Sequence, residues 1–474
     1  MARVLMASGH DIEQLRVDRG GNPEVFRELL RRRFQDVTLV DQILAADTIW
    51  REMQSKINAM KKEYNAANKE VGQKMKAKEP CDDLKAANVA LDQQIKAEEV
   101  KLVEAALARD ALLTRLPNFV HDSVPVEQDE EKNEVVITFG ERRLEEGLHS
   151  HVDVLYMCDM VDYERGARIA GGRGYFLKGD GVLLNLALIN YSLQFLTARG
   201  YSALQTPFFM QKSVMQKVAQ LSSFDEELYK VSGEGEEKYL IATSEQPIAA
   251  YHHEEWLHPK DLPHRYAGYS TCFRKEAGSH GRDTAGIFRI HQFEKIEQFC
   301  ITSPDDDESW AELEKMRDCA ADFYKSLGIP YRVVNIVSGE LNDAAAKKFD
   351  LEAWFPGSKA YRELVSCSNC LDYQARRLGI RYGQTAKTKS QVGGNEKKFV
   401  HMLNATLCAT ERTMCCVAEC FQTPEGLAIP EVLQPFMGGR KFVPFVKEAL
   451  IDQDKAKQAK AAKKNEKNKA AAAM

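Results

Sequence analysis

The most informative part of this sequence is TCFRKE over residues 271–276, followed after a loop rich in glycine, serine and histidine by IFRIHQFEKIEQF over residues 287–299. Both runs have the apolar and aromatic content of strands, and the segment between them has the composition of a loop. The pattern therefore predicts a β-hairpin. On such a rigid scaffold, Arg274 and Glu276 stand where a polyphosphate and an adenine could be contacted.

Two further runs accompany this hairpin. Residues 181–199 are strongly apolar and predict a helix that ends at Gly200, and YSALQTP follows over residues 201–207. FVHMLNATLCATER, over residues 399–412, predicts a strand that continues into a helix carrying Arg412. Taken alone, the first run is explained by an ordinary helix before an ordinary strand. The order and spacing of all three runs carry the information.

In chain order, the three runs resemble motifs 1, 2 and 3 of the class II aminoacyl-tRNA synthetases. The HQFEKIE segment makes the resemblance specific to the seryl-tRNA synthetases. The third run departs from the general class II form, because Ala405, Thr406 and Ala409 replace glycines and allow a close strand–helix approach less freely. The resemblance extends over essentially the whole chain, apart from the extreme N-terminus and the lysine-rich tail.

The fold expected is α+β. Strand-like segments alternate with helical ones up to about residue 446, which predicts a mostly antiparallel sheet with helices. The resemblance implies a class II antiparallel β-sheet core flanked by helices, with an N-terminal antiparallel coiled-coil arm. We place a tRNA-binding domain at 1–119 with its hairpin at about 39–116, a catalytic domain at 120–446 and a lysine-rich tail at 447–474. Residues 120–174 are expected to connect the first two.

The activity that the resemblance implies is an ATP-dependent serine–tRNA ligase. Such an enzyme activates L-serine with ATP to seryl-adenylate and pyrophosphate, and then transfers serine to the 3′ end of serine tRNA. Selenocysteine tRNA is a second candidate acceptor. The implied state is a cytoplasmic homodimer.

Activation brings a carboxylate and the α-phosphate of ATP together, so the site needs cations that hold two anions in place. Arg274 and Arg412 are the predicted catalytic residues, since a planar guanidinium fork matches both oxyanions. Arg289 and Arg412 are expected on the leaving pyrophosphate, Phe293 on adenine, and Glu276 on its exocyclic amine. The predicted ATP-binding set is Arg274, Lys275, Glu276, Arg289, Ile290, Phe293, Glu363, Leu364, Val365, Ser366 and Arg412.

Serine recognition requires polar groups in a small pocket. Thr243-Ser244-Glu245 corresponds to the Thr-x-Glu serine-binding loop of the family, and Glu363-Leu364-Val365-Ser366 to its metal- and ATP-binding segment. The predicted serine-binding set is Thr243, Ser244, Glu245, Arg274, Glu297, Asn404 and Thr406. Magnesium on the phosphates is expected at the Glu363 carboxylate and the Ser366 hydroxyl, which are hard oxygen ligands. No zinc is expected.

The arm is predicted from a heptad pattern. Ile43, Trp50, Ile57, Tyr64 and Val71 fall seven residues apart, with Ala46, Met53, Met60 and Ala67 three residues after the first four. Pro80 and the acidic residues after it break the pattern, and a second stripe follows at Leu84, Leu91, Ile95, Leu102, Ala106 and Leu113. The surface of the arm carries ten lysines: 56, 61, 62, 69, 74, 76, 78, 85, 96 and 101. For a coiled coil of unknown function these would be a solvated face, but the family resemblance favours tRNA binding.

Composition limits the remaining possibilities. The chain has 474 residues, a formal net charge of −5 and 11 cysteines. The odd cysteine count and the lack of a signal-like N-terminus favour free thiols in the cytoplasm. No apolar run is long enough to predict a membrane span.

Three weaker motifs are set aside. Cys367 and Cys370 form a single Cys-x-x-Cys without a second pair, and Leu257 stands where a zinc protease helix needs a second histidine. The glycine cluster at 171–174 lacks the ending of a phosphate-binding loop and is expected to be a connection. Three rival functions stay open at this stage: a non-catalytic synthetase-like protein, a class II ligase for another amino acid such as threonine or proline, and a coiled-coil scaffold.

Overall fold

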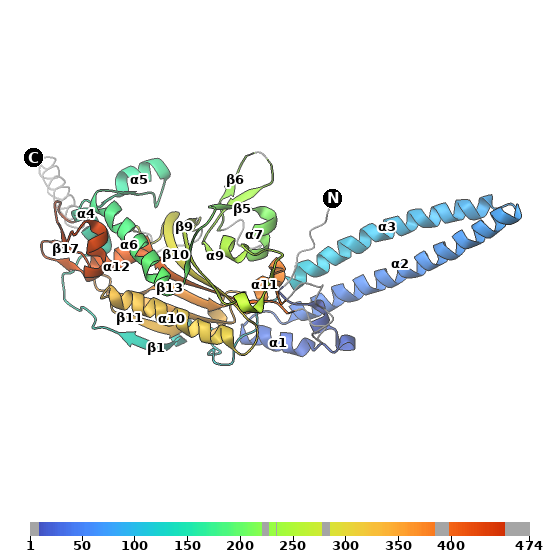
Figure 1. The fold of residues 1–474 in the computed structure, drawn as a ribbon, viewed down its shortest axis with the longest axis horizontal. Coiled ribbons are helices and arrows are strands. Elements are labelled where there is room, and N and C mark those ends of the chain that lie inside the picture. Colours follow the sequence, from blue (N-terminus) through green and yellow to red (C-terminus); the bar gives the residue numbers. More distant parts are fainter. Residues whose placement is uncertain (1–8, 220–226, 234, 277–284, 384–397, 451–474) are drawn as a thin grey trace, which may run out of the picture.

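The computed structural model describes residues 9–219, 227–233, 235–276, 285–383 and 398–450. A two-helix arm projects from a body made of a large sheet covered by helices (Figure 1). Among these residues, no helix has the length and apolar character needed to cross a bilayer. The expected α+β class and the N-terminal coiled-coil arm are both confirmed.

The body is organised by an eight-stranded sheet in the order β1-β11-β12-β13-β15-β10-β9-β4. All neighbouring pairs are antiparallel except β4 with β9. The strands are β1 (Glu134–Phe139), β4 (Ser202–Gln205), β9 (His264–Phe273), β10 (Gln292–Thr302), β11 (Tyr331–Asn335), β12 (Lys347–Phe355), β13 (Ala360–Asn369) and β15 (His401–Ala409).

One face of this sheet is covered by helices. The covering elements are α4 (His151–Met157), α6 (Asp180–Thr197), α10 (Glu308–Ser326) and α12 (Thr410–Cys420), and they share one apolar core with the sheet. Helix α6 buries Leu184, Leu188 and Leu196 on the side that meets the sheet. It ends as expected, with Gly200 at φ 84° allowing the Tyr201 amide to turn back onto the Leu196 carbonyl at 3.2 Å.

The opposite face carries smaller elements around an open centre. These are β5 (Phe209–Gln211), α7 (Lys212–Val218), β6 (Lys230–Val231), β7 (Lys238–Leu240), α9 (Glu245–Ala249), β8 (Trp256–Leu257), α11 (Tyr373–Leu378) and β14 (Arg381–Tyr382). Short elements complete the rest: β2 (Val161–Asp162), α5 (Tyr163–Ala170), β3 (Phe176–Leu177), β16 (Gln422–Thr423), β17 (Gly426–Ala428) and β18 (Phe442–Pro444).

Residues 120–174 do more than connect two domains. They supply the edge strand β1, the helix α4 in the main core and the helix α5. The strand β1 was not visible in the sequence because it is short and half exposed, with Val135 and Val136 open to solvent.

The arm consists of α2 (Thr38–Ala77) and α3 (Asp82–Leu113), with α1 (Pro23–Arg32) at its base. Helix α2 ends where Lys78 takes a left-handed conformation and the Glu79 amide bonds the Lys74 carbonyl at 2.9 Å, just before Pro80. The predicted heptad residues lie along the seam, where none is exposed. A polar pair that the pattern did not predict lies at the edge of the seam: the buried Asn88 donates through Nδ2 to Oδ1 of the exposed Asn68 at 2.5 Å.

The arm meets the body through an apolar cluster and a buried arginine. Leu30, Val40 and Leu113 pack together with Val334 and Ile336 of the body. Arg33 donates to the carbonyls of Asn118, Leu341, Asn342 and Ala345 at 2.5–3.2 Å. Burial lowers the pKa of Arg33 to about 10.

Candidate active site

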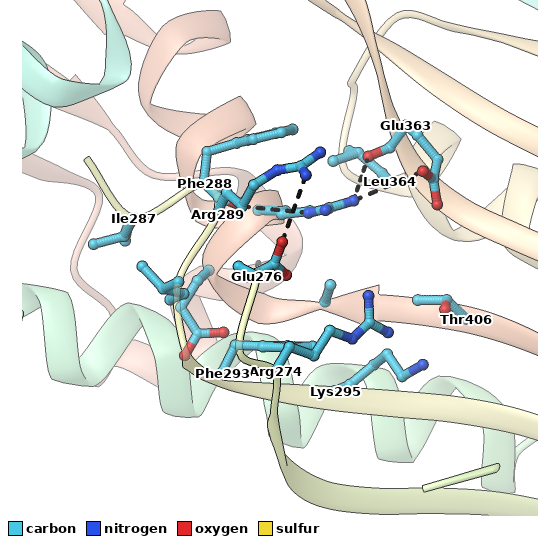
Figure 2. Close-up of a pocket in the computed structure, with 14 residues that line it drawn as sticks. Arg274, Glu276, Ile287, Phe288, Arg289, Phe293, Lys295, Glu363, Leu364 and Thr406 are labelled. Atoms are coloured by element: carbon cyan, nitrogen blue, oxygen red, sulfur yellow. Dashed lines mark hydrogen bonds and ion pairs between the residues drawn. The ribbon is translucent and has the colours of Figure 1, made fainter. Parts of the chain in front are cut away.

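A cavity opens on the sheet face opposite the helix layer, beside the first turn of α12. It brings together nine of the predicted site residues: Arg274, Glu276, Arg289, Ile290, Phe293, Glu363, Leu364, Thr406 and Arg412. They come from the β9–β10 hairpin, β13, β15 and α12, which are far apart in the sequence. Figure 2 shows Glu276 facing Arg289, with Arg274 and Lys295 below them.

Arg274 directly follows β9 and is held firmly. Its backbone is clamped by His291, whose carbonyl accepts from the Arg274 amide at 2.9 Å and whose Nδ1 lies 3.0 Å from the Arg274 carbonyl. Its Nε donates to the Ala242 carbonyl at 3.2 Å, and its guanidinium carbon lies 5.2 Å from the centre of the Phe293 ring. The terminal nitrogens therefore project into the cavity from a fixed base.

Arg289 lies before β10, not within it as the sequence predicted. The strand begins only at Gln292, and residues 285–291 form an irregular return segment. Arg289 Nη1 lies 3.5 Å from Glu276 Oε2, and Arg173 Nη1 lies 4.0 Å from the same oxygen. Two cations thus flank the carboxylate that was predicted to contact adenine.

Arg412 completes a cationic cluster. It stands in the first turn of α12, where its Nε donates to the Phe288 carbonyl at 3.3 Å and its Nη1 lies 3.9 Å from Glu363 Oε2. Burial lowers the pKa of Arg412, and the charges of Arg274 and Arg289 lower it further. Three guanidinium groups in one partly buried cavity repel one another, and a polyanion relieves that repulsion.

A β-bulge in β13 shapes the segment that was predicted to bind the metal. Leu351 pairs with Val365 and Glu352 pairs with Glu363, so Leu364 is the additional residue. The bulge brings Glu363 and Ser366 to the same face of the sheet although they are three apart in the sequence. Asp350 lies directly opposite Ser366, and burial followed by the nearby Glu363 charge raises its pKa.

The oxygens of Glu363 and Ser366 are hard ligands of the kind that a divalent metal ion prefers. Glu363 is half exposed and lines the cavity, and Ser366 presents a hydroxyl on the same face. No group of three His, Cys, Asp or Glu side chains in the described part of the chain stands at metal-binding spacing. Two protein oxygens are a partial ligand set, which suits a divalent ion that completes its shell with water and phosphate.

A second polar centre adjoins the cavity at Lys295. Lys295 Nζ lies 2.5 Å from Glu297 Oε2, and Thr243 Oγ1 donates to the same oxygen at 3.4 Å. Thr406 is the cross-strand partner of Glu297, and Asn404 follows two residues away on the same face of β15. Glu245 is half-buried nearby, where its amide donates to Thr243 Oγ1 at 3.2 Å.

Of the predicted serine-binding residues, Thr243, Glu245, Glu297 and Thr406 lie together here, whereas Ser244 does not join them. Ser244 is fully buried and packs against Gly268 of β9. The two residues are so close that a Cβ atom on Gly268 would lie 3.1 Å from Ser244 Oγ. Among the predicted ATP-binding residues, Val365 packs into the helix-covered core. Lys275 donates its amide to the Glu227 carbonyl at 2.9 Å.

Several site residues were missed by the sequence analysis. Lys295 could have been found, because it alternates with Phe293 and Glu297 on one face of a predicted strand. Arg173 lies in the glycine cluster at 171–174, which the sequence analysis set aside as a connection. Glu411 lines the cavity and holds the Glu294 amide at 3.0 Å and the Tyr175 hydroxyl at 2.9 Å, and burial raises its pKa to about 7.

The antiparallel sheet, the hairpin with its arginines and the strand–helix unit carrying Arg412 define a class II aminoacyl-tRNA synthetase. Residues 229–421 match the class II core domain of the tRNA synthetases for G, H, P, S and T, and residues 10–120 match the seryl-tRNA synthetase N-terminal domain.

The relatives narrow this class to one family. The chain is 55% identical to the cytoplasmic serine–tRNA ligase of Arabidopsis thaliana, over 95% of this chain and 100% of that protein. It is 52% identical to the cytoplasmic serine–tRNA ligase of Homo sapiens, over 98% of this chain and 96% of that protein. The crystal structure of the cytoplasmic serine–tRNA ligase of Naegleria fowleri with AMP matches with a TM-score of 0.80 at 51% identity, covering 92% of this chain and 99% of that one. This chain belongs to the seryl-tRNA synthetase family.

Proposed function

We propose that this chain is a cytoplasmic serine–tRNA ligase that activates L-serine with ATP and then transfers the seryl group to the 3′ end of serine tRNA. One observation carries the proposal: Arg274, Arg289 and Arg412 line a single cavity that adjoins the Lys295–Glu297–Thr243 centre. The close relatives are named serine–tRNA ligases, and the structure from Pyrococcus horikoshii, 38% identical with a TM-score of 0.82, was solved with ATP.

In the first step, a serine carboxylate oxygen attacks the α-phosphorus and the bond to the β-phosphate bridging oxygen breaks, releasing pyrophosphate. Arg274 binds the carboxylate and the α-phosphate together, which brings two mutually repelling anions into contact. Arg289 and Arg412 neutralise the charge that develops on pyrophosphate. The fixed base of Arg274 supports this role, because a preorganised cation needs no reorganisation in the transition state.

The adenine lies against Phe293, with its exocyclic amine directed to Glu276. Lys275, Ile290, Leu364 and Val365 contribute backbone around the nucleotide. Magnesium, held by Glu363 and Ser366 with the phosphates, supplies charge neutralisation. The shared face of Glu363 and Ser366 created by the bulge supports this assignment.

The serine site is formed by the residues around Glu297. Glu245 and Thr243 accept the ammonium, and Glu297, Asn404 and Thr406 bind the hydroxyl. Alanine is rejected because it would leave these buried polar groups without partners. The low exposure of Glu297, Asn404 and Thr406, at 2%, 8% and 9%, supports a pocket in which an unmade hydrogen bond is costly.

The arm, within a tRNA-binding region at residues 1–119, binds the tRNA backbone. Six of its lysines pair with an acidic neighbour: Lys56, Lys61, Lys74, Lys85, Lys96 and Lys101. Lys62, Lys69 and Lys76 are exposed, have no ion pair within 4.0 Å along the described arm, and repeat every seven residues on α2. This row, which we call the lysine row, is the surface that we assign to the phosphates.

The functional unit is a homodimer. Val182, Leu183 and Leu186 are 39–46% exposed on one side of α6. Leucines and valines grouped on a helix next to the edge strand β4 favour burial against a second copy.

Serine-dependent exchange of pyrophosphate into ATP tests the proposal. We expect exchange with L-serine and at least 100-fold less with threonine, proline or alanine at equal concentration. A pure, folded protein that exchanges with another amino acid, or with none, would contradict it.

A further inference from the structure

Gln374 connects a short helix to the serine pocket. It stands in the first turn of α11, is 3% exposed, and its Nε2 donates to Glu245 Oε1 at 2.8 Å. We propose that Gln374 is a positioning residue for serine recognition, whose amide holds the Glu245 carboxylate directed at the substrate ammonium. The inference rests on the proposed serine–tRNA ligase function.

The helix that carries Gln374 is fixed on several sides. Ala375 and Leu378 pack in the same apolar cluster as Ile248 of α9. At the ends of α11, Arg377 Nη2 donates to the Gln216 carbonyl at 2.8 Å and the Tyr373 hydroxyl donates to the Leu116 carbonyl at 3.0 Å. The amide is therefore delivered to Glu245 by a rigid element.

Only one orientation of the Gln374 side-chain amide suits an ionised Glu245. An ionised carboxylate only accepts hydrogen bonds, so the NH₂ end of Gln374 must face Glu245. Its Oε1 is buried without a donor from the described protein. A buried acceptor without a donor is unfavourable. The hydrogen bond from Gln374 to Glu245 is therefore made although it leaves the other end of the same amide without a donor.

The two carboxylates of the pocket differ in their partners. Glu297 is paired with the Lys295 ammonium at 2.5 Å. Glu245 has no ion pair within 4.0 Å in the described chain, and its side-chain partner is the neutral amide of Gln374. A carboxylate whose charge is not yet matched is the one available to an incoming ammonium.

The surroundings of Glu245 explain why it needs a donor. Burial raises its pKa, and Glu297 raises it further, while Gln374 lowers it, as do the charges of Lys295 and Arg274. The buried Cys370 thiol also faces it, with Glu245 contributing to the raised pKa of that thiol. Without the amide, the pKa of Glu245 rises, and a protonated carboxyl group no longer attracts the ammonium electrostatically.

Gln374→Met tests this, because methionine keeps the volume and removes the donor. We expect the KM for serine in pyrophosphate exchange to rise about 10- to 100-fold, as loss of a charge-assisted hydrogen bond predicts, with the KM for ATP unchanged. The acid limb of the pH profile of kcat/KM for serine should move to higher pH. Inhibition by serinol, which keeps the ammonium, should weaken, whereas inhibition by L-glycerate, which lacks it, should not change.

Gln298→Met is the matched control, since Gln298 is fully buried on the helix-covered side of β10 and binds Tyr201 and the Met316 carbonyl. It should lower stability without moving the pH profile. If Gln374→Met does not fold, Gln374→Asn carries the test, because the shorter side chain withdraws the donor from Glu245, and the serine KM and the acid limb should shift in the same directions. Active wild-type enzyme whose Gln374 variants keep the normal serine KM and pH profile would overturn the inference. A wild type without serine-dependent exchange would instead overturn the proposed function.

Discussion

The arm and the active site differ in how their positively charged side chains are arranged. On the arm, most lysines lie beside a glutamate or aspartate, as Lys61 does at 2.7 Å from Glu99. In the active site, Arg274, Arg289 and Arg412 converge, and their mutual repulsion contributes to the lowered pKa of Arg412. A cluster of like charges is unfavourable until an anion binds, so the three arginines indicate an anion-binding active site. The lysine row is spread along one helix face, which indicates binding to an extended anionic surface.

Removing one cation from the cluster should have the largest effect. Arg274→Ala is expected to lower serine-dependent exchange by about 10³-fold, close to 4 kcal/mol of transition-state stabilisation. Steady-state exchange measures it, and Arg317→Ala, on the far side of the sheet, is the control. Near-normal exchange would remove Arg274 from its bridging role.

Shortening the arm should distinguish the role of the arm from that of the active site. Replacing residues 54–102 by a short turn keeps Leu39, Val40, Ile43 and Leu113, which pack at the base of the arm. Exchange should stay within about threefold, and charging of serine tRNA should fall at least about 100-fold. Parallel loss of both activities would mean that the arm is needed to form the active site.

Neutralising the lysine row should weaken tRNA binding selectively. The triple variant Lys62→Ala, Lys69→Ala and Lys76→Ala is expected to bind serine tRNA about tenfold less tightly near physiological salt. The slope of log affinity against log salt should fall by about 2 to 3. A triple alanine variant of the paired Lys74, Lys85 and Lys96 is the control, and an equal loss in both would refute a dedicated row.

The smallest effect is expected inside the seam of the arm. Asn88→Leu removes the hydrogen bond to Asn68, which is exposed and can bond water instead, and should destabilise the arm by about 0.5–1 kcal/mol. Changing both asparagines to leucine should restore or raise stability while loosening the helix register. Amide hydrogen exchange across α2 and α3 measures both, and an unchanged single variant would show that the pair carries no energy.

The sequence predicted the elements whose signal is local and repeated. Heptads from Ile43 to Val71 located the arm, and the Gly200 stop located the end of α6. It could not predict the bulge at Leu364, because strand register depends on the neighbouring strand β12. It also missed Asn88 and Arg173, since a polar residue in a seam or beside glycines resembles an ordinary surface residue until the packing is known.

The buried contacts of Arg33 fix the direction in which the arm leaves the body. Four carbonyls from both sides of the junction hold one guanidinium, and the 40-residue α2 extends about 60 Å from it. Rocking by one degree would displace the far end by about 1 Å, a shift that is costly for reacting atoms positioned within a site. The hydrogen bonds of Arg33, together with the apolar cluster around the junction, therefore limit how far a tRNA bound near the tip would move relative to the catalytic face.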